Sequence, residues 1–188
     1  MDKEEVFRLL KQTESPLKKQ LLTVALISYL LQEQGKESPI IIGGLALAYY
    51  TREVYFTADI DLAYSDRDAL DEVLTDIEFR KEGRYWINED LKVAVEVPAG
   101  VLIDEDSPLE TVELGSDLQC QIIGIEDLII DRLNACKHWK SEIDCEMVEL
   151  LVTRYVEELD WAYLETKAAK PKNDVLQELL AFKSKVQS

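Results

Sequence analysis

The chain has 188 residues, with 21 Lys and Arg against 38 Asp and Glu, so its formal net charge is −17 at pH 7. A hydrophobic fraction of 47% beside 31% charged residues is normal for a globular protein and argues against wholesale disorder. The negative charge argues against a general binder of nucleic-acid backbones, which needs dense Lys and Arg, but leaves room for a metal that brings its own positive charge.

The first half of the chain alternates helical and strand patterns, which predicts a small mixed sheet with helices packed on it. Ser15 before Pro16 is a typical helix start, because serine caps the helix and proline suits its first turn. Three isoleucines before Gly43 and Gly44 indicate a short buried strand. The predicted elements are helices over residues 3–13, 16–34, 45–52 and 66–77, and strands over residues 39–42, 58–64, 85–87 and 91–97.

The second half is mainly helical by pattern. Weaker strand patterns run through residues 101–103 and 118–123, and the acidic segment 104–108 is the predicted loop before the helical part. The sequence therefore predicts an α/β fold, or α+β by strict usage, with a core over residues 1–105 and a mainly helical C-terminal region over residues 106–188. The predicted C-terminal helices cover residues 126–139, 142–158, 160–169 and 173–186.

Three carboxylates carry the chemistry that the sequence suggests. Asp59 and Asp61 stand two residues apart on a predicted strand, so both side chains project from one face. Glu96 repeats this arrangement on another predicted strand and converges with them if the two strands are neighbours. Such a group of like charges favours a divalent cation, and an all-oxygen site suits Mg²⁺ or Mn²⁺ bound with substrate phosphates. An isolated Asp-x-Asp is more often the solvated face of an edge strand.

Gly43 and Gly44 add weight to the metal-site interpretation, because they lie between a predicted strand and a predicted helix. Glycines at such a place let the backbone approach a phosphate closely, and the following helix N-terminus offers free N–H groups. A plain tight turn is the ordinary alternative.

Together these segments resemble the nucleotidyltransferase superfamily that includes DNA polymerase β. In that family a strand, a Gly-Gly or Gly-Ser turn and a helix precede a strand with Asp-x-Asp, and a later strand bears a third carboxylate. The matching stretches here are Ile40–Tyr50, Thr57–Leu62 and Val93–Val97.

The resemblance implies metal-dependent transfer of an NMP group from an NTP to an acceptor. The implied catalytic residues and ligands of Mg²⁺ or Mn²⁺ are Asp59, Asp61 and Glu96. The implied nucleotide-binding residues are Gly43, Gly44, Thr57 and Arg132. Thr57 could also position the strand that bears Asp59 and Asp61, and an ordinary strand threonine is the simpler alternative.

Two later segments resemble a small bacterial branch of the superfamily, grouped with abortive-infection and type IV toxin–antitoxin proteins. Ile125–Ala135 matches its Glu-Asp-Leu-Ile helix and Ser141–Leu151 its later acidic helix, so the similarity covers roughly residues 38–165. This implies a role in toxin–antitoxin or phage-defence systems and a protein partner encoded nearby. The chain departs from the pattern in that Arg132 replaces Lys and Glu96 replaces Asp.

The main local cluster of positive charge is Arg132 with Lys137, Lys140 and the single His138. This cluster could meet nucleotide phosphates or an RNA acceptor. The ordinary alternative is a charged helix end, since cations near a helix C-terminus interact favourably with its dipole.

The rival hypothesis is a catalytically inactive protein of the same fold that binds another protein, for example as an antitoxin. The high negative charge would suit a basic partner. The orientation of Glu96 discriminates between the two, because an enzyme needs its three carboxylates close enough to share a metal. For an enzyme, the same charge favours a protein or small-molecule acceptor over RNA.

Cys120, Cys136 and Cys145 are an odd number without Cys-x-x-Cys spacing, which predicts reduced, buried thiols. The acidic first residues lack the apolar core of a signal peptide. The longest mostly apolar run, Leu21–Leu31, is too short for a membrane span, which needs about 20 residues. We therefore expect a cytoplasmic protein that does not bind membranes.

Overall fold

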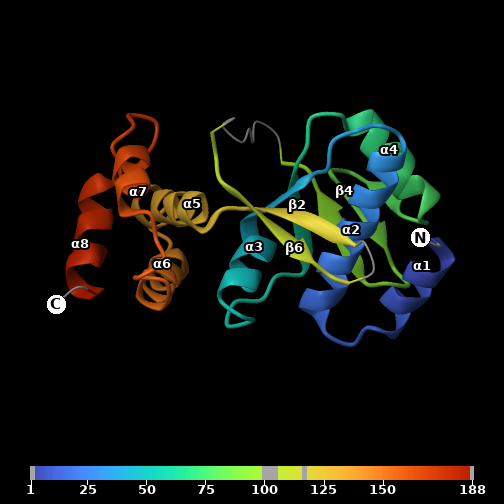
Figure 1. Ribbon diagram of the computed structural model, residues 1–188, viewed down its shortest axis with the longest axis horizontal. Coiled ribbons are helices and arrows are strands. Elements are labelled where there is room, and N and C mark those ends of the chain that lie inside the picture. Colours follow the sequence, from blue (N-terminus) through green and yellow to red (C-terminus); the bar gives the residue numbers. More distant parts are fainter. Residues whose placement is uncertain (1–2, 99–105, 116–117, 187–188) are drawn as a thin grey trace. The chain divides into compact units, whose positions relative to one another are not determined.

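The computed structural model describes residues 3–98, 106–115 and 118–186 (Figure 1). It divides the chain into two compact units. The first, which we call the sheet unit, comprises Met1–Tyr49 and Phe56–Ile123. The second, the helical unit, comprises Tyr50–Tyr55 and Gly124–Ser188.

The sheet unit contains a mixed sheet of seven strands in the order β3-β4-β5-β2-β1-β7-β6. Strand β2 pairs in parallel with β5, and β1 pairs in parallel with β7. The remaining neighbours are antiparallel. This confirms the predicted mixed sheet. The strands are β1 (Ile40–Ile42), β2 (Asp59–Ala63), β3 (Arg80–Glu82), β4 (Tyr85–Asn88), β5 (Val93–Glu96), β6 (Leu109–Glu113) and β7 (Gln119–Ile123).

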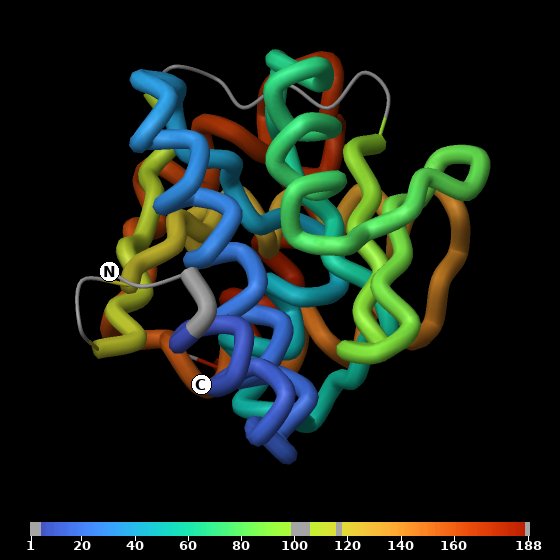
Figure 2. The backbone as a smooth tube through the Cα atoms, turned by 90° about the vertical axis from the view of Figure 1, so that its right-hand side faces the viewer, coloured from blue at the N-terminus to red at the C-terminus, as the bar shows by residue number. Residues whose placement is uncertain are grey.

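Two helices of the sheet unit, α2 and α4, start at side-chain caps. The side chain of Ser15 accepts a hydrogen bond from the backbone N–H of Lys18, and that of Asp66 accepts one from Ala69, which satisfies N–H groups that a helix start leaves open. The largely buried α2 packs against β7 and α4 (Figure 2). The helices are α1 (Lys3–Gln12), α2 (Pro16–Glu33), α3 (Gly43–Tyr50) and α4 (Arg67–Asp76).

Four helices build most of the helical unit, and side-chain caps mark the starts of α6 and α7. Ser141 and Asp160 accept hydrogen bonds from backbone N–H groups three residues further on. The segment Tyr50–Tyr55 joins this unit, and the hydroxyl of Tyr155 donates to the carbonyl of Tyr50 at 2.9 Å. The helices are α5 (Ile125–His138), α6 (Glu142–Arg154), α7 (Trp161–Ala168) and α8 (Leu176–Val186).

The boundary between the units lies later than the sequence predicts. The prediction divides the chain after residue 105, whereas β6 and β7 complete the sheet and the helical unit resumes at Gly124. Strands β3 and β6 are absent from the prediction because they are the two sheet edges and almost all of their side chains are exposed. An exposed edge strand lacks the alternating apolar pattern that reveals strands. The predicted strand at 101–103 lies outside the described residues.

The cysteines correct one prediction. Cys120 is buried and free, as expected, but Cys136 and Cys145 form a disulfide across a Cα–Cα distance of 4.9 Å. The prediction of reduced thiols is wrong for this pair. The two residues lie on α5 and α6, which are joined by a short turn and pack together, so the hairpin brings them close. Sequence spacing alone does not show such packing.

The prediction of no membrane span is consistent with the helices of the described chain. Among the described residues, no helix combines the length and the apolar character that crossing a bilayer requires.

Candidate functional site

Strand β2 presents two carboxylates on one face of the sheet. Asp59 and Asp61 are half-buried, whereas the alternating residues Ile60 and Leu62 are fully buried on the opposite face. The strand is therefore anchored by its apolar side and displays its acidic side. The same alternation that the sequence predicted is seen here.

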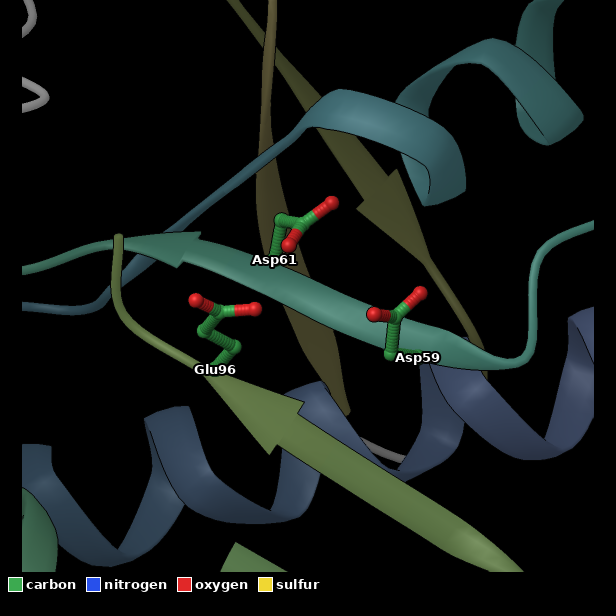
Figure 3. A group of neighbouring side chains, drawn as sticks. All are labelled: Asp59, Asp61 and Glu96. Carbon is green, nitrogen blue, oxygen red and sulfur yellow. The ribbon is translucent and has the colours of Figure 1, made fainter. Parts of the chain in front are cut away.

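The third carboxylate comes from the neighbouring strand. Strand β5 runs parallel to β2 with Asp61 in register with Glu96, so the two side chains leave the sheet next to each other. One oxygen from each of Asp59, Asp61 and Glu96 lies within 4.8 Å of the others, and Figure 3 shows the three side chains converging. Glu96 is only 8% exposed, so its charge stands in a partly dehydrated place.

The glycine turn after β1 lies against Asp61. Ile42 pairs with Asp61, and the backbone N–H of Gly44 donates to Oδ2 of Asp61 at 3.3 Å. Gly43 has a φ of +60°, and a Cβ there would stand 2.3 Å from the same oxygen. Position 43 therefore requires glycine for two reasons: other residues rarely adopt this backbone conformation, and a side chain would collide with the carboxylate of Asp61. Helix α3 begins at Gly43 rather than at the predicted residue 45, so its positive N-terminal end faces Asp61.

Thr57 orients the first carboxylate. Its Oγ1 donates a hydrogen bond to Oδ1 of Asp59 at 2.7 Å, and a Cβ on Gly44 would lie 2.8 Å from that hydroxyl oxygen. The carbonyl of Thr57 accepts a hydrogen bond from Nε2 of the buried Gln20 at 3.2 Å. Helix α2, the glycine turn and the start of β2 are thus joined through Thr57. The sequence prediction named Thr57 but missed Gln20. Gln20 lies 37 residues before Thr57 in the chain, so only the fold shows that the two are in contact.

Arg84 is the second residue that the sequence prediction missed. Its Nε lies 3.3 Å from Oε1 of Glu96, and its Nη2 donates to the hydroxyl of Tyr85. The hydrogen bond to Tyr85 raises the pKa of Arg84 further above its usual range, and the charges of Glu96 and Asp59 add to this. One feature could have pointed to Arg84. It lies in a tight turn, directly before Tyr85, and Tyr85 pairs with Glu96.

The donor set fits a small hard cation. Three carboxylates without nitrogen or sulfur ligands match the preference of Mg²⁺ and Mn²⁺ for oxygen. Ligand oxygens lie about 2.1 Å from Mg²⁺, so two on opposite sides of the ion are about 4.2 Å apart. The observed spread of up to 4.8 Å needs only small side-chain movements to reach such a geometry. A cation would also relieve repulsion between like charges.

Arg132, the remaining predicted nucleotide-binding residue, lies in the helical unit. Its Nη1 donates to Oδ1 of Asp144 at 2.9 Å and its Nε to Oδ2 of Asp131 at 3.1 Å. Burial lowers the pKa of Arg132, but the charges of Asp131 and Asp144 outweigh it and raise the pKa overall. The guanidinium bridges α5 and α6, so a phosphate ligand would have to compete with two carboxylates. The predicted role of Arg132 at a nucleotide stays a prediction.

Two other members of the basic cluster, Lys137 and His138, make contacts within the helical unit. Nζ of Lys137 interacts with Asp174 and with Glu178, and Nε2 of His138 lies 2.9 Å from the carbonyl oxygen of Asn173. These contacts join the end of α5 to α8 and to the segment before it, which accounts for the two residues by packing.

Comparison with known proteins gives one family. Residues 19–184 match the sequence model of a family described as a nucleotidyltransferase of unknown function (DUF6036). No curated protein matches the chain. Among solved structures, the antibiotic-resistance factor ANT(2'')-Ia aligns with a TM-score of 0.49 and 15% identity, over 100% of this chain and 99% of that chain.

Proposed function

The chain belongs to this family of nucleotidyltransferases, and we propose that it moves an NMP group from an NTP to an acceptor with the help of a divalent metal. The observation that supports this best is the convergence of Asp59, Asp61 and Glu96 within 4.8 Å on one face of the sheet. Their spacing also favours an active enzyme over an inactive binding protein of the same fold, because an inactive protein has no need to keep three like charges together.

In the proposed site, Asp59, Asp61 and Glu96 hold Mg²⁺ or Mn²⁺. When bound, the metal stabilises negative charge on the transferring phosphoryl group and makes the acceptor hydroxyl more acidic. Thr57 keeps the carboxylate of Asp59 in one orientation through its 2.7 Å hydrogen bond. Such support of a ligand typically changes metal affinity or activity by about 10- to 100-fold.

The glycine turn is the proposed cradle for the triphosphate. Gly43 and Gly44 carry no side chains that would keep phosphate oxygens away, and their N–H groups lie at the positive end of α3. We include Thr57 among the nucleotide-binding residues because it lies against Gly44.

The chemical step exchanges one phosphorus–oxygen bond for another. The acceptor oxygen bonds to the α-phosphorus, and the bond from that phosphorus to the bridging oxygen of the β-phosphate breaks. The electron pair leaves with pyrophosphate, and the hydroxyl proton passes to the carboxylate of Glu96. No covalent intermediate on the protein is required.

We further propose that the acceptor is a protein or a small molecule rather than RNA. The net charge of −17 opposes the approach of a polyanion, whereas a neutral or cationic acceptor meets no such barrier.

The test is transfer of label from each α-³²P-labelled NTP, with Mg²⁺ or Mn²⁺, into a bacterial lysate that contains RNA and protein. The Asp59→Asn/Asp61→Asn variant runs alongside. We expect label from one NTP in one class of acceptor with the native chain, and at least about 100-fold less with the variant. RNase and protease treatment of the product then identifies the acceptor class.

An Asp68→Asn/Asp76→Asn variant is the matched control, because it removes the same charge from α4. Loss of transfer in both variants would point to net charge rather than to the metal site. No label from any NTP, together with no metal binding, would leave the rival function of a protein-binding module.

Arg132 is tested separately. If it binds nucleotide, Arg132→Gln raises the KM for the NTP about tenfold while Asp131→Asn does not. An unchanged KM would assign Arg132 to helix packing alone. The proposed role in a toxin–antitoxin or phage-defence system is tested by growth: expression of the native chain slows growth or blocks phage, whereas the Asp59→Asn/Asp61→Asn variant does neither.

A further inference from the structure

Arg84 owes its position to a tight hairpin. Strands β3 and β4 pair as far as Glu82 and Tyr85, so Gly83 and Arg84 alone form the turn. Gly83 has a φ of +62°, which suits the first position of such a turn. Tyr85 in turn pairs with Glu96 on the neighbouring strand. The turn therefore brings the guanidinium to the end of β5 where the third carboxylate stands.

The contact between Arg84 and Glu96 joins an exposed group to a buried one. The side chain of Arg84 is 70% exposed, whereas that of Glu96 is 10% exposed, with 3.3 Å between Nε and Oε1. An exposed arginine in such a pair is easily replaced, because water screens the attraction between the two charges. The carboxylate of Glu96 is buried and stays in the site.

The order of the strands separates Arg84 from the glycine turn. Gly43 follows β1, Asp61 lies on β2, Glu96 on β5, and Arg84 precedes β4. Adjacent strands are about 4.8 Å apart, so β1 and β4 are about 14 Å apart across the two strands between them. Arg84 thus approaches the carboxylates from the side opposite the proposed triphosphate cradle, and it is a poor candidate for a phosphate ligand there.

We propose that Arg84 is a built-in counter-ion of the site that competes with the divalent metal for Glu96. In the metal-free protein the guanidinium neutralises this carboxylate and keeps it beside Asp59 and Asp61. When a metal binds to the three carboxylates, the guanidinium leaves Glu96 and turns into solvent. This inference rests on the proposed metal site and assigns to Arg84 the control of its affinity.

The effect of this competition on metal affinity can be estimated from the fraction of molecules in which the pair is formed. A ligand that binds only the open state loses affinity in proportion to the fraction of molecules in that state. If the pair between Arg84 and Glu96 is formed in about 70 to 90% of metal-free molecules, its removal tightens metal binding about threefold to tenfold.

The experiment measures Mn²⁺ binding to the purified full chain by electron paramagnetic resonance of the free ion, without nucleotide or acceptor. We expect Arg84→Gln to bind Mn²⁺ about threefold to tenfold more tightly than the native chain. Arg84→Lys keeps the competing charge and stays closer to the native affinity. Arg80→Gln is the matched control, because Arg80 is exposed on the same hairpin and pairs with Ile87 rather than lying beside Glu96.

Two results would overturn the inference, and they differ from failure of the proposed function. If Arg84→Gln and Arg80→Gln shift the affinity equally, only the overall charge matters. If Arg84→Gln weakens binding, Arg84 assists the metal site instead of competing with it. In both cases native binding that Asp59→Asn/Asp61→Asn abolishes would still support the metal site. Absence of Mn²⁺ binding by the native chain would overturn the metal site and the inference together.

Discussion

The hydroxyl of Thr57 donates a hydrogen bond of 2.7 Å to Oδ1 of Asp59 and stands directly against the backbone of Gly44. One small side chain therefore fixes the orientation of a carboxylate and the separation between β2 and the glycine turn. Nε2 of Gln20 donates a hydrogen bond of 3.2 Å to the backbone carbonyl of Thr57. The carboxylate of Asp59 is thus positioned by Thr57, whose backbone is in turn held by Gln20.

The first prediction concerns this hydrogen bond. Thr57→Val keeps the shape of the side chain but removes the donor to Asp59, so we expect Mn²⁺ affinity to fall about tenfold. Thr57→Ser retains the hydroxyl and should bind nearly as the native chain does. Isothermal titration with Mn²⁺ checks both. Equal affinities in Thr57→Val and the native chain would show that Asp59 needs no such support.

The second prediction uses two glycines with similar backbones. Gly35 and Gly43 have φ values of +71° and +60°, but only at Gly43 would a Cβ meet Asp61. Gly35→Ala should cost about 1–2 kcal/mol of unfolding free energy through backbone strain alone, with normal Mn²⁺ binding. Gly43→Ala should cost at least as much and also weaken Mn²⁺ binding, because the new methyl displaces the Asp61 carboxylate. Urea unfolding and Mn²⁺ titration measure the two effects. Normal binding in Gly43→Ala would contradict the close approach.

The third prediction concerns the bond between Cys136 and Cys145. Closing a short loop removes conformational freedom from the unfolded chain, so Cys136→Ser/Cys145→Ser should lower the free energy of unfolding by about 2–3 kcal/mol. The native chain in dithiothreitol should match this variant. Thiol titration of the unfolded, unreduced chain should find one free cysteine, Cys120. Three free thiols there would show that the bond does not form.

The fourth prediction is a dependence of stability on pH. Burial raises the pKa of the Cys120 thiol from 9.0 to about 12. The unfolded chain therefore releases this proton at a lower pH than the folded chain, so the thiol's contribution to stability is complete below pH 9 and declines from there up to about pH 12. Urea unfolding at pH 8 and pH 10 should show a smaller loss in Cys120→Ala than in the native chain. Parallel losses would mean that Cys120 titrates normally.

The candidate site was largely predictable because its residues follow local rules. Alternation along one strand places Asp59 and Asp61 on the same face, and a glycine pair between strand and helix marks the turn beside them. Glu96 could be named as a candidate on the same grounds. Its approach to the other two required β5 to lie next to β2 in register, and sequence spacing alone does not state which strands are neighbours.

The sequence by itself determined the elements with a strong apolar pattern, such as α2 and the buried β1, β2 and β5. Most buried positions in these elements carry an apolar residue, so the spacing of apolar residues in the sequence reveals the element. Only the tertiary structure decided which strands pair, that the exposed β3 and β6 form the sheet edges, and that Cys136 meets Cys145. It also decided that Arg84 reaches Glu96. These relations depend on contacts between segments that are distant in the chain, or on how neighbouring helices pack. Such contacts leave no periodic pattern in the sequence.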